Sequence, residues 1–170
     1  MNNLAALLAD EIRAGRMGRE RLAEARGYAE RALAIVEQLD DLSLEPWKDY
    51  SLAAKLADLE GQPAQAAAYR RREREAFAAF PGNRWHIDQQ HGALIQAIAA
   101  AARGDGAARA WVEGEFPKME AADWRNVPPA IRKLWAGERE WHALCEGVDA
   151  TSALLLLRVV EDVGGVDCRL

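Results

Sequence analysis

Apolar residues recur along this chain at steps of three and four positions and hardly anywhere in alternation with polar ones. Between positions 19 and 39 the recurring residues are Leu22, Ala25, Ala29, Ala32, Val36 and Leu39. This spacing gathers apolar side chains into one stripe along an α-helix. Val, Ile and Thr are also sparse beside Ala, Leu, Glu and Arg, which lose little side-chain freedom in a helix. The sequence therefore predicts an all-α fold.

Breaks in this pattern divide the chain into about eight predicted helices. Their ranges are 3–14, 19–38, 46–61, 63–80, 84–103, 107–121, 128–145 and 151–163. Prolines at positions 46, 63 and 128 suit the first turn of a helix, because a missing N–H costs nothing there. We expect Pro81-Gly82-Asn83 to form a turn, and Asp149 or Thr151 to cap the last helix. Successive helices joined by such short turns are expected to pack antiparallel.

Composition and charge narrow the class of protein. A chain of 170 residues with 50% hydrophobic and 29% charged residues can bury a core. The formal net charge of -5 gives no general attraction to nucleic acids or anionic lipids. The first residues lack the basic start of a secretory signal, and the apolar run at 153–157 is far too short to span a bilayer. We therefore expect a cytoplasmic protein with reduced thiols at Cys145 and Cys168 and with no nucleic-acid or membrane partner.

Residues 24–35, EARGYAERALAI, resemble the second helix of a tetratricopeptide repeat. Ala25 and Ala32 fall where that repeat needs side chains small enough for two helices to approach closely. Tyr28 and Leu33 fall where the repeat has bulky residues. The match therefore lies in the pattern of small and large residues along one helix.

A second match covers residues 47–81. Gly61 stands at the glycine of the repeat's inner turn, and Ala54 and Ala66 stand at the two small positions that meet across the hairpin. Arg70 and Glu73 depart from the pattern, because the repeat usually has an aromatic and a small residue there. The two units are 41 positions apart (66 minus 25) instead of about 34. Residues 69–105 also resemble the degenerate C-terminal repeats of larger bacterial tetratricopeptide proteins.

The resemblance implies a right-handed solenoid of stacked helical hairpins. Residues 1–163 would then form a single domain, with repeat-like hairpins in 1–105 and capping helices in 106–163, followed by a flexible tail at 164–170. It also implies a non-catalytic scaffold that binds a protein or peptide partner in a groove and needs no cofactor. The groove of such a stack is lined by the first helix of each hairpin.

The predicted helix at 46–61 carries the candidate groove residues. Lys48, Ser51, Lys55 and Asp58 share the face away from the leucines at positions 52, 56 and 59. Lys48 and Lys55 are seven apart, which places them two turns apart on one side. Similar repeats use such lysines to hold an acidic peptide or a C-terminal carboxylate. The alternative is an ordinary solvated polar face.

Two of the three histidines lie in the stretch 84–92, RWHIDQQHG. Asp88 and His91 share a helix face, as do His142 and Cys145, so the four could in principle form a zinc site. The simpler interpretation is that His91 lies on the apolar stripe of its helix and packs against the core, with one hydrogen bond, for example to Asp88. We expect no metal on this interpretation.

The remaining motifs concern nucleic-acid binding and catalysis. The basic run 70–75, RRRERE, alternates with glutamates that can neutralise it, as Arg71 with Glu75 and Arg70 with Glu73. The sequence contains no glycine-rich phosphate loop, and its serines have no histidine nearby in sequence that would indicate a nucleophile and base.

Two alternatives to a peptide-binding scaffold remain open at this stage. One is a self-associating structural or capping domain of a larger signalling assembly, with exposed Trp135 and Trp141 marking the contact face of a homo-oligomer. The other is a helical enzyme, which would need a converging polar cluster that the sequence does not reveal.

Overall fold

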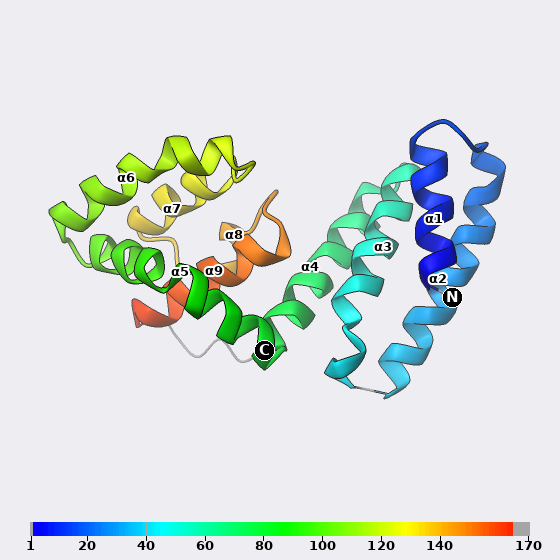
Figure 1. Cartoon of the computed structure of the whole chain (residues 1–170), viewed down its shortest axis with the longest axis horizontal. Coiled ribbons are helices and arrows are strands. Elements are labelled where there is room, and N and C mark those ends of the chain that lie inside the picture. Colours follow the sequence, from blue (N-terminus) through cyan, green and yellow to red (C-terminus); the bar gives the residue numbers. More distant parts are fainter. Residues whose placement is uncertain (1, 40, 165–170) are drawn as a thin grey trace. The chain divides into compact units, whose positions relative to one another are not determined.

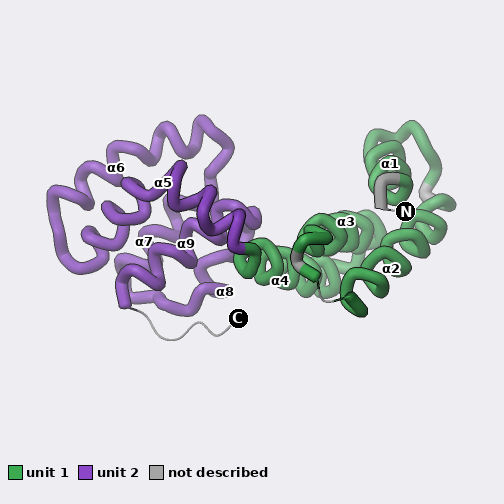
Figure 2. Tube along the Cα trace, turned by 60° about the horizontal axis from the view of Figure 1, so that its bottom comes forward, with its two compact units in different colours: residues 1–80 green, residues 81–170 purple. Residues whose placement is uncertain are grey.

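The computed structural model describes residues 2–39 and 41–164 of the chain, and the regular secondary structure within these ranges is all helical (Figure 1). These residues form nine α-helices and two short 3-10 helices, and none of them forms a strand. The predicted all-α class is therefore confirmed. The chain divides into two compact units, residues 1–80 and 81–170 (Figure 2). None of the described helices combines the length and the apolar character that crossing a bilayer requires.

Unit 1 contains four α-helices. They are α1 (Asn2–Arg13), α2 (Leu22–Leu39), α3 (Pro46–Leu59) and α4 (Pro63–Ala79), with 3-10 turns at Arg19–Arg21 and Leu42–Leu44. The α1 helix packs against α2, and α3 packs against all three of the others. Leucines and alanines of α1, α2 and α3 form a buried core, in which Ala5 and Ala25 are fully buried. These small side chains let the helix backbones approach closely, so α3 is held at the centre of the unit.

The turn between α3 and α4 is built around Gly61. The N–H of Gly61 donates to the carbonyl of Asp58 at 3.0 Å, and the N–H of Gln62 donates to that of Ala57 at 2.8 Å. This pair of bonds is a Schellman motif, which needs a residue with positive φ; Gly61 has φ 74°. Ala54 and Ala66, which the sequence placed on facing small positions, are both buried in the two helices that this turn joins.

Trp47 fixes the other end of this helix pair. It lies in the first turn of α3, next to Pro46, and only 8% of its surface is exposed. Its ring lies edge-on to Phe77, with centroids 5.6 Å apart, and 5.3 Å from the ring of Phe80. The two phenylalanines belong to the C-terminal end of α4, so this aromatic cluster joins the start of α3 to the end of α4.

Unit 2 is built around a helix with almost no polar face. Its elements are α5 (Pro81–Ala102), α6 (Gly106–Ala121), α7 (Val127–Trp135), α8 (Trp141–Leu144) and α9 (Ala150–Asp162). The α5 helix packs against α6 and α9, and α7 and α8 complete the unit. In α9 every residue from 152 to 157 is buried, so this part of the helix is enclosed on all sides. Asp149 caps it, accepting hydrogen bonds from the N–H groups of Thr151 and Ser152 at 2.9 and 3.0 Å.

Ion pairs join α5 to α9. Arg158 donates from Nε and Nη2 to the two carboxylate oxygens of Asp88, at 2.9 and 3.0 Å. Arg84 donates to both carboxylate oxygens of Glu161 at 2.8 Å, and Glu161 also pairs with Arg158. Two residues from each helix therefore form one charge network across the contact between α5 and α9.

Several local predictions are wrong. Pro81-Gly82-Asn83 is the first turn of α5 rather than a separate turn, because proline suits a helix start as well as a bend. The break between α4 and α5 lies at Phe80, which has an extended backbone. The predicted helix at 128–145 ends at Trp135 and resumes as α8. The positive φ of Gly137, 109°, lies between these two segments.

The expectation that Trp135 and Trp141 are exposed for self-association is also wrong. Trp141 is 4% exposed, and its indole donates to the carbonyl of Ala153 at 2.8 Å. Trp135 is half-buried and donates to the carbonyl of Ile98 at 3.1 Å. Both indoles therefore serve the interior of unit 2, since a buried N–H requires a partner.

Two further expectations concern the division of the chain and its C-terminal tail. The division expected after residue 105 falls in the short turn between α5 and α6, inside unit 2. Beyond Gly164, the expected tail lies outside the described residues, as does Cys168.

Candidate functional site

The four predicted groove residues lie on the polar side of α3, and three of them have a specific polar partner. Lys48 is exposed and forms an ion pair with Glu45, which precedes the helix. Asp58 is exposed and pairs with Arg70 of α4. Ser51 is half-buried and forms a hydrogen bond with Glu73 of α4.

Lys55 is the member of this set that remains without a carboxylate. It is exposed, and among the described residues no carboxylate oxygen lies within 4 Å of its ammonium nitrogen. Glu73 contributes a longer-range attraction. Burial raises the pKa of Glu73, and Ser51, Arg74 and Lys55 oppose that rise. The charge of Lys55 is therefore largely available to a ligand at the surface.

Lys55 and Asp58 line an open hollow between α1 and α3, the α1–α3 hollow. Its lining residues are Ala9, Asp10, Arg13, Lys55, Asp58 and Leu59, and its accessible volume is about 100 Å³. Arg13 donates to Asp10 at 3.1 Å, so these two rim charges neutralise each other. Ala9 is almost fully buried, and with Leu59 it gives the hollow an apolar floor. The sequence predicted the α3 side of this hollow but not the α1 side.

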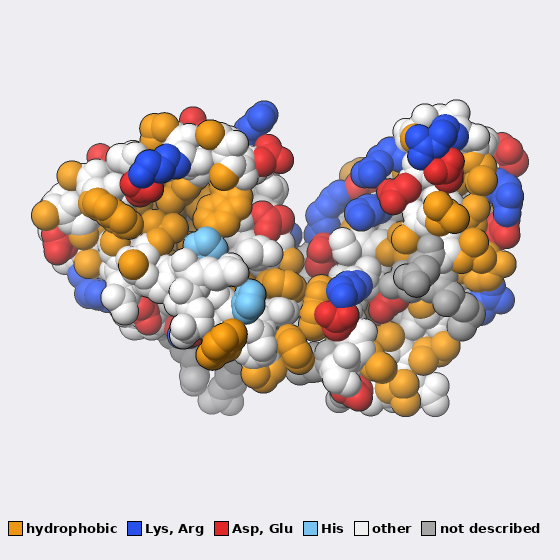
Figure 3. Space-filling view, in the orientation of Figure 1, with side chains coloured by type: hydrophobic (Ala, Val, Ile, Leu, Met, Phe, Trp, Pro, Cys, Tyr) orange, Lys and Arg blue, Asp and Glu red, His pale blue; other side chains and the backbone are white. Residues whose placement is uncertain are grey.

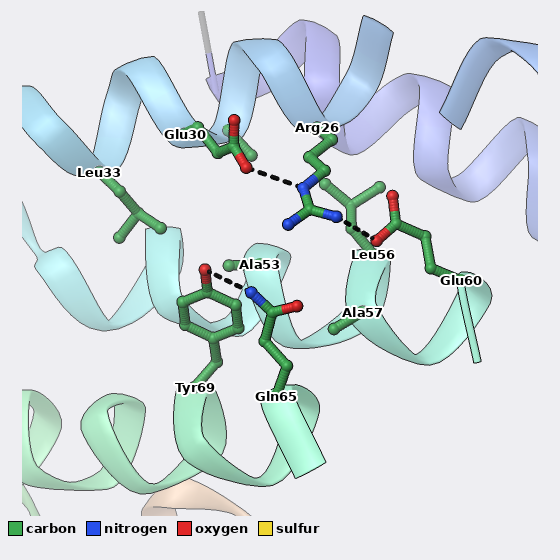
Figure 4. Close-up of a pocket in the computed structure, with 10 residues that line it drawn as sticks. Arg26, Glu30, Leu33, Ala53, Leu56, Ala57, Glu60, Gln65 and Tyr69 are labelled. Atoms are coloured by element: carbon green, nitrogen blue, oxygen red, sulfur yellow. Dashed lines mark hydrogen bonds and ion pairs between the residues drawn. The ribbon is translucent and has the colours of Figure 1, made fainter. Parts of the chain in front are cut away.

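A second hollow, the α2–α4 pocket, opens on α3 from a different set of neighbours (Figure 4). Its accessible volume is about 20 Å³, which is room for little more than one water molecule. Its apolar lining is Ala29, Leu33, Ala53, Leu56 and Ala57, and its polar lining is Arg26, Glu30, Glu60, Gln65 and Tyr69. The residues come from α2, α3 and α4, with Glu60 at the C-terminal end of α3.

Arg26 organises the polar side of this pocket. Its Nε donates to Glu30 at 2.7 Å and its Nη1 donates to Glu60 at 2.8 Å. The hydrogen bond with Glu30 and the charge of Glu60 raise the pKa of Arg26 above its ordinary value. On the opposite wall, the amide of Gln65 donates to the Tyr69 hydroxyl over 3.4 Å. The Arg26–Glu30 spacing of four positions could have been noticed in the sequence, whereas Glu60 lies 34 positions away.

The histidine stretch contributes no cluster of metal ligands. Asp88 is engaged by Arg158, so it does not serve His91 as expected. His91 is half-buried against Trp124, with ring centroids 5.1 Å apart, and burial lowers its pKa. The structure does not bring Asp88, His91, His142 and Cys145 together, and no group of three or more His, Cys, Asp or Glu in residues 2–39 and 41–164 is placed to hold a metal ion. Cys145 is fully buried.

The basic run on α4 is distributed among several partners. Arg71 pairs with Glu75 at 3.0 Å, as predicted, and Arg72 pairs with Glu37 at 2.9 Å. Arg70 pairs with Asp58 rather than with Glu73. Basic and acidic side chains are interspersed over the face of unit 1 that Figure 3 displays, so no large patch of one sign covers it.

With the geometry described, the chain can be compared with known proteins. No protein-family model matches it, and comparisons with characterised proteins and with solved structures find no match either. The chemistry of the two hollows in unit 1 is therefore the basis for assigning a function.

Proposed function

We propose that unit 1 is a protein-interaction module of the tetratricopeptide kind, and that its α1–α3 hollow holds a carboxylate of a partner polypeptide. Three features support the helical-repeat part of this proposal. The α3 helix contacts α1, α2 and α4, Gly61 forms the turn between α3 and α4, and Ala54 and Ala66 are buried in that pair. In such a stack α1 and α3 would be the first helices of two hairpins, which line the groove.

The observation that carries the ligand assignment is the charge balance of the hollow. Asp10 is neutralised by Arg13 and Asp58 by Arg70, while no carboxylate lies within 4 Å of Lys55 among the described residues. The lining itself has two positive and two negative charges, but Arg70 of α4 pairs with Asp58 from outside it, so among the described residues Lys55 remains as a positive charge without a close carboxylate beside an apolar floor. A peptide's C-terminal carboxylate, or an aspartate or glutamate side chain, provides the matching charge. The apolar floor would accept the neighbouring aliphatic groups.

The expected loss of affinity on reversing the lysine charge can be estimated from one charge-assisted hydrogen bond to the ligand's carboxylate. Such a bond contributes about 1.5–3 kcal/mol, so reversing the lysine charge should weaken binding at least tenfold. The effect on stability should be small. Lys48 and Lys55 are exposed, and the exposed Lys48–Glu45 pair is worth at most about 1 kcal/mol.

The test compares two double variants that change the net charge equally. Lys48→Glu with Lys55→Glu alters the proposed groove, and Lys118→Glu with Lys133→Glu alters two exposed lysines of unit 2. Partners captured from a lysate by the wild-type chain are identified, and peptides from them are measured by isothermal titration calorimetry as free acids and as C-terminal amides.

The proposal requires that the groove variant loses a partner that the control variant retains. It also requires that neutralising the peptide's carboxylates weakens binding. A partner that binds all three proteins equally would show that this hollow is not the site.

A further inference from the structure

Arg70 of α4 does not line the α1–α3 hollow, but it pairs with Asp58, which does. Arg70 is also one of the two residues at which residues 47–81 depart from the tetratricopeptide pattern. We infer that Arg70 determines the specificity of the hollow: by holding Asp58 it keeps that carboxylate away from Lys55, and so leaves the lysine for the carboxylate of a ligand. This inference rests on the proposed function and names the residue that makes the site selective.

Asp58 is the partner that the sequence of α3 provides for Lys55. The two residues are three positions apart, a spacing that brings oppositely charged side chains of a helix within reach of each other. A basic residue followed three positions later by an acidic one does form an ion pair in α9, where Arg158 pairs with Glu161. In the described structure no such pair joins Lys55 to Asp58 within 4 Å, because Asp58 is directed to another helix.

The helix hairpin brings Arg70 to this carboxylate. Arg70 and Asp58 are 12 positions apart and lie on opposite sides of the turn at Gly61, so their contact depends on the packing of α4 against α3. A guanidinium offers a carboxylate a planar set of donors and is less strongly hydrated than an ammonium, which favours arginine over lysine in this competition. The Arg70 and Asp58 side chains are 44% and 43% exposed, so the loss of their ion pair should leave unit 1 folded.

The other carboxylates near Lys55 have partners that do not depend on Arg70. Asp10, across the hollow, is bonded to Arg13 at 3.1 Å. Glu73 of α4 is half-buried and forms a hydrogen bond with Ser51. Removing the guanidinium at position 70 therefore releases one carboxylate of the hollow's own lining, and that carboxylate lies three positions from the lysine.

The first measurement needs no ligand. The ammonium signal of Lys55 is assigned in the full-length ¹⁵N-labelled chain and followed by NMR, at a low temperature and a mildly acidic pH at which ammonium protons exchange slowly. Arg70→Ala should shift this signal, because Asp58 becomes the partner of the lysine, and Arg70→Ala with Asp58→Asn should return it to its wild-type position. The matched control is Arg71→Ala, which removes the same charge from the next position of α4, where the arginine pairs with Glu75. It should leave the signal in place.

The second measurement uses isovalerate, which joins a carboxylate to a branched aliphatic group, and isovaleramide, its neutral counterpart. Molecules of this size suit an accessible volume of about 100 Å³. Each is titrated at constant ionic strength while the amide signals of Ala9, Lys55 and Leu59 are followed. Isovalerate should bind the wild type with a Kd of about tens of mM. Arg70→Ala should raise that Kd about two- to fivefold, the equivalent of one exposed ion pair, and should not weaken the binding of isovaleramide.

A cycle of variants separates this role of Arg70 from two others. Asp58→Asn alone should change the Kd of isovalerate by less than about twofold, because Asp58 is already engaged in the wild type, and Arg70→Ala with Asp58→Asn should restore near-wild-type binding. If Arg70 itself contacted the ligand, the double variant would not recover. If Arg70 acted only through its distant charge, Arg71→Ala would weaken binding as much as Arg70→Ala. Either result overturns the inference.

The two measurements distinguish a failure of this inference from a failure of the proposed function. A Lys55 signal that stays in place in Arg70→Ala overturns the role of Arg70 whether or not isovalerate binds. A signal that moves and returns as expected, in a chain whose amide signals isovalerate does not shift, supports the release of Lys55 by Arg70 and contradicts the carboxylate site. Thermal melts check that each variant is folded, and Arg70→Gln repeats the test if Arg70→Ala is not.

Discussion

Replacing Trp47, the only tryptophan in residues 1–80, by alanine should strongly destabilise unit 1. The side chain is 8% exposed and contacts both Phe77 and Phe80. Removing it takes away the contact between the start of α3 and the end of α4 and leaves a cavity whose walls are the two phenylalanine rings. These helices cannot close such a cavity without shifting α3, which is also packed against α1 and α2.

The expected cost can be divided into two parts. Truncating a buried tryptophan to alanine costs about 3–5 kcal/mol in total. Each aromatic pair contributes about 0.5–1.5 kcal/mol beyond its buried area, so the two pairs of Trp47 account for about 1–3 kcal/mol of that sum. Trp47→Phe keeps a ring in the cluster and should cost less than half as much as Trp47→Ala.

Urea denaturation followed by far-UV circular dichroism measures this loss. Trp85→Ala is the matched control, because Trp85 is 61% exposed and its only ring contact in the described structure is with His86. It should change the free energy of unfolding by no more than about 0.5 kcal/mol. If the two units unfold in separate transitions, only one transition should move in Trp47→Ala. A loss below about 1 kcal/mol, or an equal loss in both variants, would refute the role assigned to the aromatic cluster.

Three further changes test the local physics of the fold by equilibrium and thermal unfolding. Asp149→Ala should cost about 1 kcal/mol, because two N–H groups at the start of α9 lose their acceptor, while Asp149→Asn should retain most of it. A destabilisation by Asn as large as that by Ala would contradict the capping role. Gly61→Ala should cost about 1 kcal/mol at φ 74°, and Gly27→Ala, in the middle of α2 with open space around it, should not destabilise; equal losses would contradict the argument. Burial raises the pKa of Asp49 above 3.8, so the folded state binds its proton more tightly than the unfolded chain does. The resulting stabilisation is full below pH 3.8 and is lost as the pH rises through the folded pKa, so the melting temperature of Asp49→Asn relative to the wild type should increase from about pH 3.5 to pH 7. A pH-independent difference would show that Asp49 does not titrate in this way.

The helix boundaries were predictable where a short-range signal was unambiguous. Pro46 and Pro63 open α3 and α4 as expected, and Asp149 caps α9. These signals act within one helical turn, so the sequence contains them in full. Pro81-Gly82-Asn83 was misjudged because the same tripeptide suits both a turn and a helix start, and only the surrounding packing selects between them.

The candidate sites were predictable only in part. Helical periodicity placed Lys48, Ser51, Lys55 and Asp58 on one side of α3, and this holds. Their neighbours were not predictable, because Arg70 reaches Asp58 from another helix.

The sequence by itself determined the helices and the side on which each one is polar, because backbone hydrogen bonding, capping and the three-to-four-residue repeat are properties of consecutive positions. Only the tertiary structure decided which polar sides meet. The Arg26–Glu60 pair spans 34 positions and the Arg158–Asp88 pair spans 70, so each depends on how whole helices pack. The same is true of the two hollows beside α3, since a hollow is the space that neighbouring helices fail to fill. That space depends on side-chain volumes from several helices at once, which no local pattern in the sequence records.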